Sequence, residues 1–305
     1  MRIGLDVGGT KIDAIALDDA DNILAQMRVR TGFGPEAVVC NTVLAASGVA
    51  DAAGLSLRSF QSLGVGIPGV VDPDTGVVRH AVNLGLRELN LGEVLADRVG
   101  LPVGVENDVN AASLGAARLL GLDGSMAYLN LGTGLAAGYV INGRLWRGRQ
   151  GIAGEIGHIV VDPAGEWCAC GQRGCLETTA SGGWLARKWI TDHPYPVLDI
   201  VDSADAGNPN AVTTRDDFVN GAAQAVKILA LTADVETIVI GGGISNLGVR
   251  LLDLIRRALD QQASHSSFLA SLRLSARVQL VPQGSPVAAF GAALAEPMMQ
   301  DVAVV

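Results

Sequence analysis

Three of the four cysteines lie close together in the middle of the chain, shortly after a histidine. The candidate metal ligands are His158, Cys168, Cys170 and Cys175. Three thiolates and one imidazole form the donor set of a closed, tetrahedral, structural zinc site. Gly171 and Gly174 permit the tight turns that converging ligands need. The alternative is a set of unrelated thiols, some free and one pair joined by a disulfide; the density of cysteine and glycine beside a histidine favours zinc.

Three apolar, strand-like runs each end in a glycine turn that is suited to phosphate. The candidate nucleotide-binding residues are Asp6, Gly8, Gly9, Thr10 and Lys11 in the first turn, Gly132, Thr133 and Gly134 in the second, and Gly241, Gly242 and Gly243 in the third. Glycine lets backbone N–H groups approach anionic oxygens closely. None of the turns has the P-loop or G-x-G-x-x-G spacing, and a lone turn of this kind is usually only a turn. Three of them, two in matching positions of a repeated unit, predict a nucleotide site split between two lobes.

The carboxylate best placed for acid–base chemistry stands at a predicted strand-to-helix corner, VENDVNAA, which contains Asn107 and Asp108. Asp108 is either the N-cap of the helix or a general base. Phosphoryl transfer needs a base that accepts the proton of the attacking hydroxyl, and glycine turns flank Asp108 on both sides in the sequence. Glu106 points to the opposite side of the strand from Asn107 and is expected to be structural. Asp6 either holds Mg²⁺ through water or caps its own turn.

Other polar residues stand in otherwise apolar or glycine-rich runs. They are Asn83, Glu155, His158 and Glu177. Several fixed donors and acceptors of this kind are typical of a site that binds the hydroxyl groups of a sugar.

Composition narrows the class of protein. The chain has 305 residues, of which 49% are apolar and 17% charged, so it is compact and globular rather than disordered. Its formal net charge of −9, without a Lys/Arg cluster, argues against nucleic acid as a partner. We expect no signal peptide and no membrane span. The cysteine pattern is not a secreted disulfide framework, which favours a reducing cytoplasm, and we expect Cys40 to be a small buried hydrophobe.

Strands that alternate with helices predict an α/β fold. Residues 4–24 and 125–148 repeat one pattern, in which an apolar run, a glycine turn, a second apolar run, a further turn and a third run follow each other. This self-similarity predicts two related lobes that face one another. We expect an N-terminal lobe of residues 1–110, to which a last helix at about 286–300 returns, and a C-terminal lobe of residues 111–285 with the zinc loop. Two further helices are expected at 183–192 and 215–234, separated by a polar stretch.

The motifs DVGGTK, GVGIPG, NLG, ENDVNAA, LGTG, GEIGH, C-x-C-G-x-x-G-C-L-E and GGGIS occur in the order found in the ROK family (repressors, open reading frames and sugar kinases). The resemblance spans essentially the whole chain. It implies duplicated lobes of the actin-like ATPase (ribonuclease H-like) superfamily with a cleft between them. It also implies transfer of the γ-phosphate of ATP to a hexose, usually at the 6-hydroxyl, and a homodimer.

Carried over to this sequence, the resemblance makes Asp108 the catalytic base. It assigns sugar contacts to Gly69, Asn83, Asn107, Asp108, Glu155, His158 and Glu177, with His158 also on zinc. The three glycine turns would hold Mg-ATP. Two positions depart from the family pattern: Ala136–Ala137 replaces a glycine after LGTG, and Ala116 replaces a common glutamate. Neither has a proposed chemical role.

Glucose is the expected substrate, and the enzyme is then a glucokinase. An N-acetylglucosamine or N-acetylmannosamine kinase is the alternative, and fructose, mannose and allose remain open. The repressors of the family carry a winged-helix domain ahead of the DVGGT-like strand; here that strand begins at Arg2 and the chain is acidic, which favours the kinase. A non-catalytic sugar sensor is a further alternative, against which Asp108 and the three glycine turns argue.

Overall fold

The structure, a computed structural model, describes residues 1–297, and its chain divides into two compact units. The first unit consists of Met1–Asp123, Gly143–Ala153 and the chain from Pro286 onward; the second consists of Gly124–Asn142 and Gly154–Ser285. The expected boundary at residue 110 differs from this division, because it would cut through helix α3 (Asp108–Leu120), which lies wholly in the first unit.

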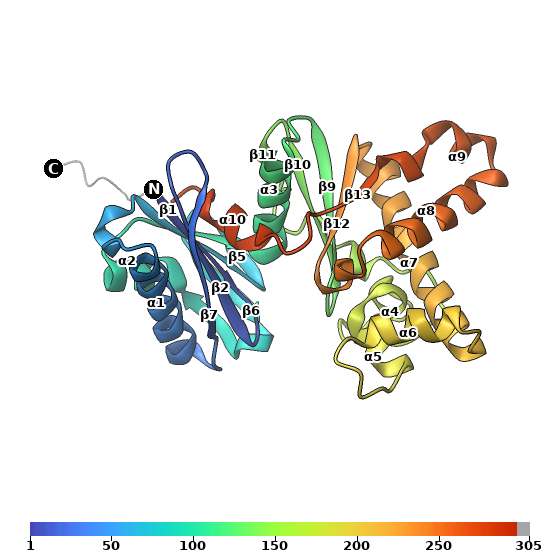
Figure 1. The fold of residues 1–305 in the computed structure, drawn as a ribbon, viewed down its shortest axis with the longest axis horizontal. Coiled ribbons are helices and arrows are strands. Elements are labelled where there is room, and N and C mark those ends of the chain that lie inside the picture. The colour runs from blue at the N-terminus through green and yellow to red at the C-terminus, as the bar shows by residue number, and fades with distance from the viewer. Residues whose placement is uncertain (298–305) are drawn as a thin grey trace. The chain divides into compact units, whose positions relative to one another are not determined.

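The first unit is built on a five-stranded sheet of order β3-β2-β1-β4-β8. Figure 1 labels its strands β1 and β2. Its strands are β1 (Arg2–Val7), β2 (Lys11–Leu17), β3 (Ile23–Arg30), β4 (Ser62–Ile67) and β8 (Val103–Asn107). Strand β1 pairs antiparallel with β2 and parallel with β4, and β4 pairs parallel with β8. A small antiparallel sheet joins β5 (Val70–Asp72), β6 (Val77–Ala81) and β7 (Leu86–Asn90).

Helices cover both faces of the main sheet. They are α1 (Pro35–Ala52), α2 (Leu91–Val99), α3 and α10 (Val287–Ala293). Alternate residues of a strand point to opposite faces. Ile3 and Leu5 of β1 therefore pack into the core shared with α1, whereas Gly4 between them faces α10, where a Cβ would lie 1.9 Å from the carbonyl oxygen of Ala289. Helix α10 is the expected last helix; residues 298–300 of that expectation lie outside the described residues.

The second sheet repeats the plan of the first, with the order β11-β10-β9-β12-β13. Its strands are β9 (Ser125–Leu131), β10 (Leu135–Ile141), β11 (Arg144–Leu145), β12 (Thr237–Gly241) and β13 (Val278–Leu280). Strand β9 pairs antiparallel with β10 and parallel with β12, as β1 does with β2 and β4. The fold class predicted from the repeated pattern is confirmed.

The second unit contains helices beyond the two expected at 183–192 and 215–234. They are α4 (Glu177–Ala180), α5 (Gly182–Lys188), α6 (Pro196–Asp205), α7 (Pro209–Ala233), α8 (Val249–Ser264) and α9 (Ser267–Leu272). Part of the polar stretch belongs to α6 and to the start of α7. Asn208 caps α7 by accepting hydrogen bonds from the amides of Asn210 and Ala211, with Pro209 at the first helical position.

The expectation of a buried Cys40 is wrong. Helix α1 buries the face that carries Val38, Val39, Thr42 and Ala46, and Cys40 lies on the exposed side, where its thiol contacts Glu36 and Arg98.

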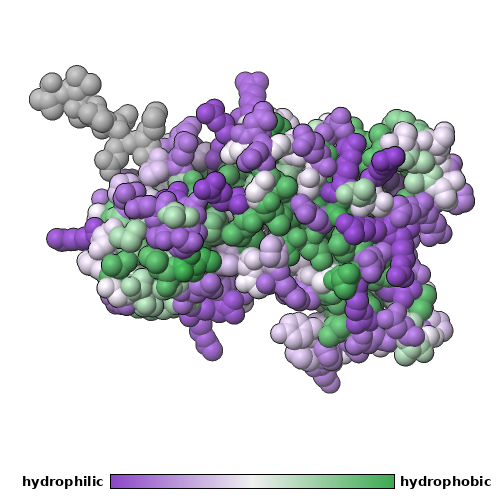
Figure 2. Space-filling model, turned by 45° about the horizontal axis from the view of Figure 1, so that its top comes forward, coloured by the Kyte–Doolittle hydropathy of each residue, from purple (hydrophilic) through white to green (hydrophobic). Residues whose placement is uncertain are grey.

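On the face drawn in Figure 2, hydrophilic residues are interspersed with hydrophobic ones. Among residues 1–297, every helix is too short or too polar to cross a bilayer.

Candidate active site and metal cluster

The corner between β8 and α3 carries the candidate base. Asn107 is the N-cap of α3, because its side-chain oxygen accepts hydrogen bonds from the amides of Val109 (3.0 Å) and Asn110 (3.1 Å). Its side-chain amide donates to the carbonyl oxygen of Gly69 at 3.1 Å. Asp108 is therefore the first residue of the helix and not its cap, and its carboxylate accepts from the amide of Val109 at 2.9 Å. The capping role that the sequence left open for Asp108 belongs to Asn107.

Beneath the corner lies Glu106, whose side chain is only 2% exposed. One carboxylate oxygen accepts from the amide of Asn107 at 3.0 Å and from the side chain of Asn110 at 3.1 Å. The other accepts from the Nε of Arg147 at 2.7 Å. These hydrogen bonds stabilise the buried carboxylate of Glu106, whose charge would be costly to remove from water without partners. Glu106 is structural, as expected, but Arg147 was not foreseen, because nothing in its local sequence connects it to Glu106.

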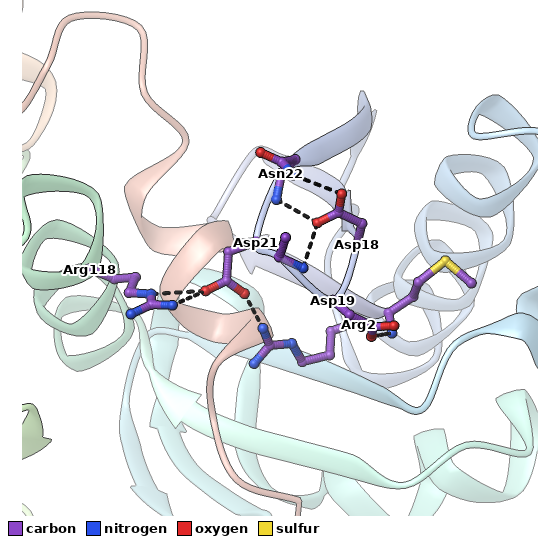
Figure 3. Close-up of polar contacts among 8 residues, drawn as sticks. Arg2, Asp18, Asp19, Asp21, Asn22 and Arg118 are labelled. Atoms are coloured by element: carbon purple, nitrogen blue, oxygen red, sulfur yellow. Dashed lines mark hydrogen bonds and ion pairs between the residues drawn. The ribbon is translucent and has the colours of Figure 1, made fainter.

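Helix α3 is also fixed along its length. Gly115 packs so closely against α10 that a Cβ would lie 1.9 Å from the carbonyl oxygen of Val287. In its last turn, Arg118 donates to Asp21 at 2.9 Å, and Arg2 of β1 contacts the same carboxylate (Figure 3). Figure 3 shows Asp21 lying between the two arginines. The helix that presents Asp108 is thus held at its start, middle and end.

The first glycine turn lies beside this corner. Asp6 is opposite Gly66 in the β1–β4 register, and a Cβ at Gly66 would lie 3.7 Å from the Cα of Asp108. Burial, followed by the charges of Asp108 and Asp13 and opposed by that of Lys11, raises the pKa of Asp6 to about 7. This concentration of carboxylates is a place where a cation stabilises the ionised form.

The turn itself is closed by a hydrogen bond from the amide of Gly8 to the carbonyl oxygen of Lys11 at 2.9 Å. Asn83 lies next to it, since a Cβ at Gly9 would be 3.5 Å from the Cβ of Asn83. Asn83 is exposed, within the 3₁₀ turn Val82–Leu84. The ammonium group of Lys11 lies 3.2 Å from the carboxylate of Asp13.

In the second unit, the four expected metal ligands converge. Their ligand atoms all lie within 4.8 Å of one another. The Sγ of Cys168 is 3.7 Å from the Nδ1 of His158, and the Sγ atoms of Cys170 and Cys175 are 3.6 Å apart. Tetrahedral Zn–S bonds of about 2.3 Å place two sulfurs about 3.8 Å apart, whereas a disulfide would bring them to about 2.05 Å. Donor set and spacing are those of a zinc site.

The surrounding loop supports this assignment. Gly171 and Gly174 have φ angles of +89° and +78°, as the expected turns require. Gln172, which sequence reasoning did not select, donates to the carbonyl oxygen of His158 at 3.1 Å and reaches the Sγ of Cys170 at 3.4 Å. Burial raises the pKa of the Cys175 thiol to about 12. A thiolate at that position needs a nearby positive charge, which a zinc ion supplies.

Glu177 connects the metal cluster to the second glycine turn. One of its carboxylate oxygens accepts from the amide of Leu135 at 3.2 Å, and the other lies 3.7 Å from the Sγ of Cys168. A Cβ at Gly134 would approach Glu177 to 2.7 Å. In the third turn, a Cβ at Gly242, whose φ is +83°, would lie 2.5 Å from the carbonyl oxygen of Leu131. Only glycine fits where these two turns meet.

Each unit therefore gathers its own share of the expected site residues. The first holds Asp6, Gly8, Gly9, Thr10, Lys11, Gly69, Asn83, Asn107 and Asp108. The second holds Gly132, Thr133, Gly134, Glu155, His158, Cys168, Cys170, Cys175, Glu177, Gly241, Gly242 and Gly243. Glu155 is exposed and immediately precedes the 3₁₀ turn Ile156–His158.

Two sheets of the same order, each with a glycine turn after its central strand, define the two-lobe actin-like fold. Within that class, the family model described as "ROK family" matches residues 2–293, and the chain belongs to the ROK family. A glucokinase from Halalkalibacterium halodurans is 36% identical over 287 residues, which cover 86% of each chain. A glucokinase from Streptomyces coelicolor is 34% identical over 279 residues, 85% of this chain and 86% of that one.

A solved structure agrees. A ROK family glucokinase from Streptomyces griseus, in complex with glucose and AMPPNP, has a TM-score of 0.80 and 34% identity, and the match covers 96% of this chain and 98% of that chain. The prediction of a ROK-family sugar kinase is confirmed.

Proposed function

We propose that this sugar kinase is a glucokinase that transfers the γ-phosphate of ATP to the 6-hydroxyl of glucose. The observation that carries the proposal is the rigid Asn107–Asp108 corner, which presents a carboxylate beside a glycine turn. The similarity to glucokinases over 85–86% of the chain supports glucose in preference to other hexoses.

In the proposed reaction, Asp108 accepts the proton of the 6-hydroxyl while the oxygen forms a bond to the γ-phosphorus, and the bond from that phosphorus to the ADP oxygen breaks. Asn107 holds the corner through Gly69 and the first amides of α3, so the carboxylate needs little rearrangement. Asn83, Gly69, Glu155, His158 and Glu177 bind the sugar. The glycine turns donate backbone N–H groups to the phosphates of ATP.

Two metal ions complete the proposal. Zinc on His158 and the three clustered cysteines fixes the loop that carries His158 and ends at Glu177, and its role is structural. Mg²⁺ neutralises the developing charge on the phosphates when it is bound, and Asp6 is the carboxylate that would hold it through water. The family resemblance also leads us to propose a homodimer, which light scattering of the purified protein tests. The cysteine pattern leads us to propose a cytoplasmic location.

The experiment is ADP release from Mg-ATP with glucose, mannose, fructose, N-acetylglucosamine, N-acetylmannosamine and allose. We expect the highest kcat/KM with glucose. A higher kcat/KM with an N-acetylhexosamine would replace glucose as the substrate but keep the kinase. No turnover with any sugar, in zinc-loaded protein that still binds sugar, would favour a sensor.

A further inference from the structure

The chain takes an unusual route around Arg147. Residues 124–142 belong to the second unit, residues 143–153 return to the first, and residue 154 begins the second unit again. The returning segment contains a closed loop, in which the amide of Ala153 donates to the carbonyl oxygen of Arg147 at 3.2 Å. Gly148 and Gly151 have φ angles of +71° and +73°, which turn the loop back on itself. We call residues 147–153 the Arg147 loop.

The loop is attached to the first unit by its arginine. The Nε of Arg147 donates to Glu106 at 2.7 Å, and a second guanidinium nitrogen contacts the same oxygen. The Glu106 side chain is 2% exposed and that of Arg147 is 35% exposed. This ion pair differs from the exposed pairs elsewhere on the first unit, such as Arg79 with Glu88, because one partner is almost completely removed from water.

The other oxygen of Glu106 contacts the corner that carries Asp108. It accepts from the amide of Asn107 and from the side chain of Asn110, one on each side of Asp108. A shift of the Glu106 carboxylate therefore moves the residues that bracket Asp108. Truncating Arg147 would leave a buried carboxylate without its cation, and the carboxylate would rearrange toward water or other donors.

We infer that Arg147 is a positioning residue for Asp108. The inference rests on the proposed role of Asp108 as the base. Arg147 touches neither sugar nor nucleotide in this account. It acts through Glu106, which it neutralises and orients.

The guanidinium is suited to this role because it places two N–H groups on one carboxylate in a fixed plane. Lysine at this position would keep the charge but direct it less well. We therefore expect Arg147→Met to have the full effect and Arg147→Lys to recover only part of the activity. Arg144 is the matched control: it lies on the same returning segment, is exposed, and forms no ion pair within residues 1–297.

The test measures kcat, KM for each substrate and melting temperature in the full-length, zinc-loaded enzyme. We expect R147M to lower kcat about tenfold or more, since small misplacements of a catalytic group are costly, while KM for ATP stays close to wild type. R144M should keep the wild-type kcat. Unchanged kcat in R147M would overturn the inference.

The decisive measurement is made in a D108N background. If Arg147 acts through Asp108, D108N and D108N/R147M have the same kcat, because the base that Arg147 positions is already missing. If R147M lowers the kcat of D108N by the same factor as that of the wild type, the effect is general damage and the inference is wrong. Should R147M not fold, R147K and the charge-neutral pair E106Q/R147M replace it in the same comparison. Wild-type turnover in D108N alone would instead refute the proposed function of Asp108.

Discussion

The corner of residues 106–110 and the metal loop of residues 158–177 both present polar groups for chemistry, but they are held by different means. At the corner, a buried Glu106 is matched by an arginine, a backbone amide and a side-chain amide, and α3 packs tightly on α10. In the metal loop, backbone hydrogen bonds such as that from the amide of Cys168 to the carbonyl oxygen of Gln172 (2.8 Å) form the turns, and ligand atoms converge at 3.6 and 3.7 Å. Trp167, its one aromatic residue, is 72% exposed.

The two regions differ in whether they offer a set of ligands for a metal ion. The corner has a hydrogen-bond partner for each charge and a packed helix behind it, so its geometry is a property of the folded chain. The loop brings three thiols and an imidazole together, and this donor set suits a bound metal ion. Removal of metal should therefore affect the metal loop and leave the corner unchanged, whereas a packing change behind the corner should leave the metal loop unchanged.

Of the proposed substitutions in the two regions, Cys170→Ser should have the largest effect, on zinc content and sugar affinity. It removes one of four ligands, and we expect zinc content to fall from about one ion per chain to near zero. Sugar affinity should fall about tenfold or more, because His158 is shared between metal and sugar. Metal analysis and calorimetric titration with glucose measure both. Hydrogen exchange should rise in residues 158–177 and stay unchanged in 103–110; normal sugar binding by the zinc-free variant would show that metal and pocket are not coupled.

Gly115→Ala should have a smaller effect, on stability, and it acts on the corner through helix α3. The new Cβ would meet the carbonyl oxygen of Val287 and the amide nitrogen of Gly291, both backbone atoms that must shift. We expect a loss of about 1–3 kcal/mol in the free energy of unfolding, only partly offset by the better helix propensity of alanine. Zinc content should not change. Urea unfolding and metal analysis test both points.

The matched control is Gly48→Ala in α1. Its Cβ would meet only the flexible end of Met27, so the stability should stay level or rise slightly. An equal loss of unfolding free energy in the two variants would show that the close packing of α3 on α10 does not contribute more to stability than the packing of α1 at Gly48.

Features that depend on local residue type and spacing could be predicted from the sequence. The ligand set of the metal cluster follows from thiols and a histidine within one loop, and the repeated unit predicts two related lobes. Asn107 and Asp108 were recognised as a strand-to-helix corner, although the sequence left open whether Asp108 caps the helix.

What the sequence did not reveal depends on contacts between distant residues. Glu106 and Arg147 are 41 positions apart, and neither carries a pattern that points to the other. The return of residues 143–153 to the first unit likewise joins segments that are distant in the sequence. Helix α6 was not predicted, although it begins ahead of the polar stretch and its apolar residues Val197, Ile200, Val201 and Ala204 have helical spacing. The Asn208–Pro209 pair likewise marks the start of α7.

The central claim is that Asp108 is the base and that its position is set by the fold and not by its own charge. Turnover of Asp108→Asn with glucose and Mg-ATP, measured beside its melting temperature and glucose affinity, tests it most directly. We expect kcat to fall by about 10²-fold or more, with melting temperature and glucose affinity close to wild type. A kcat near wild type in the folded, glucose-binding variant would show that Asp108 is not the base.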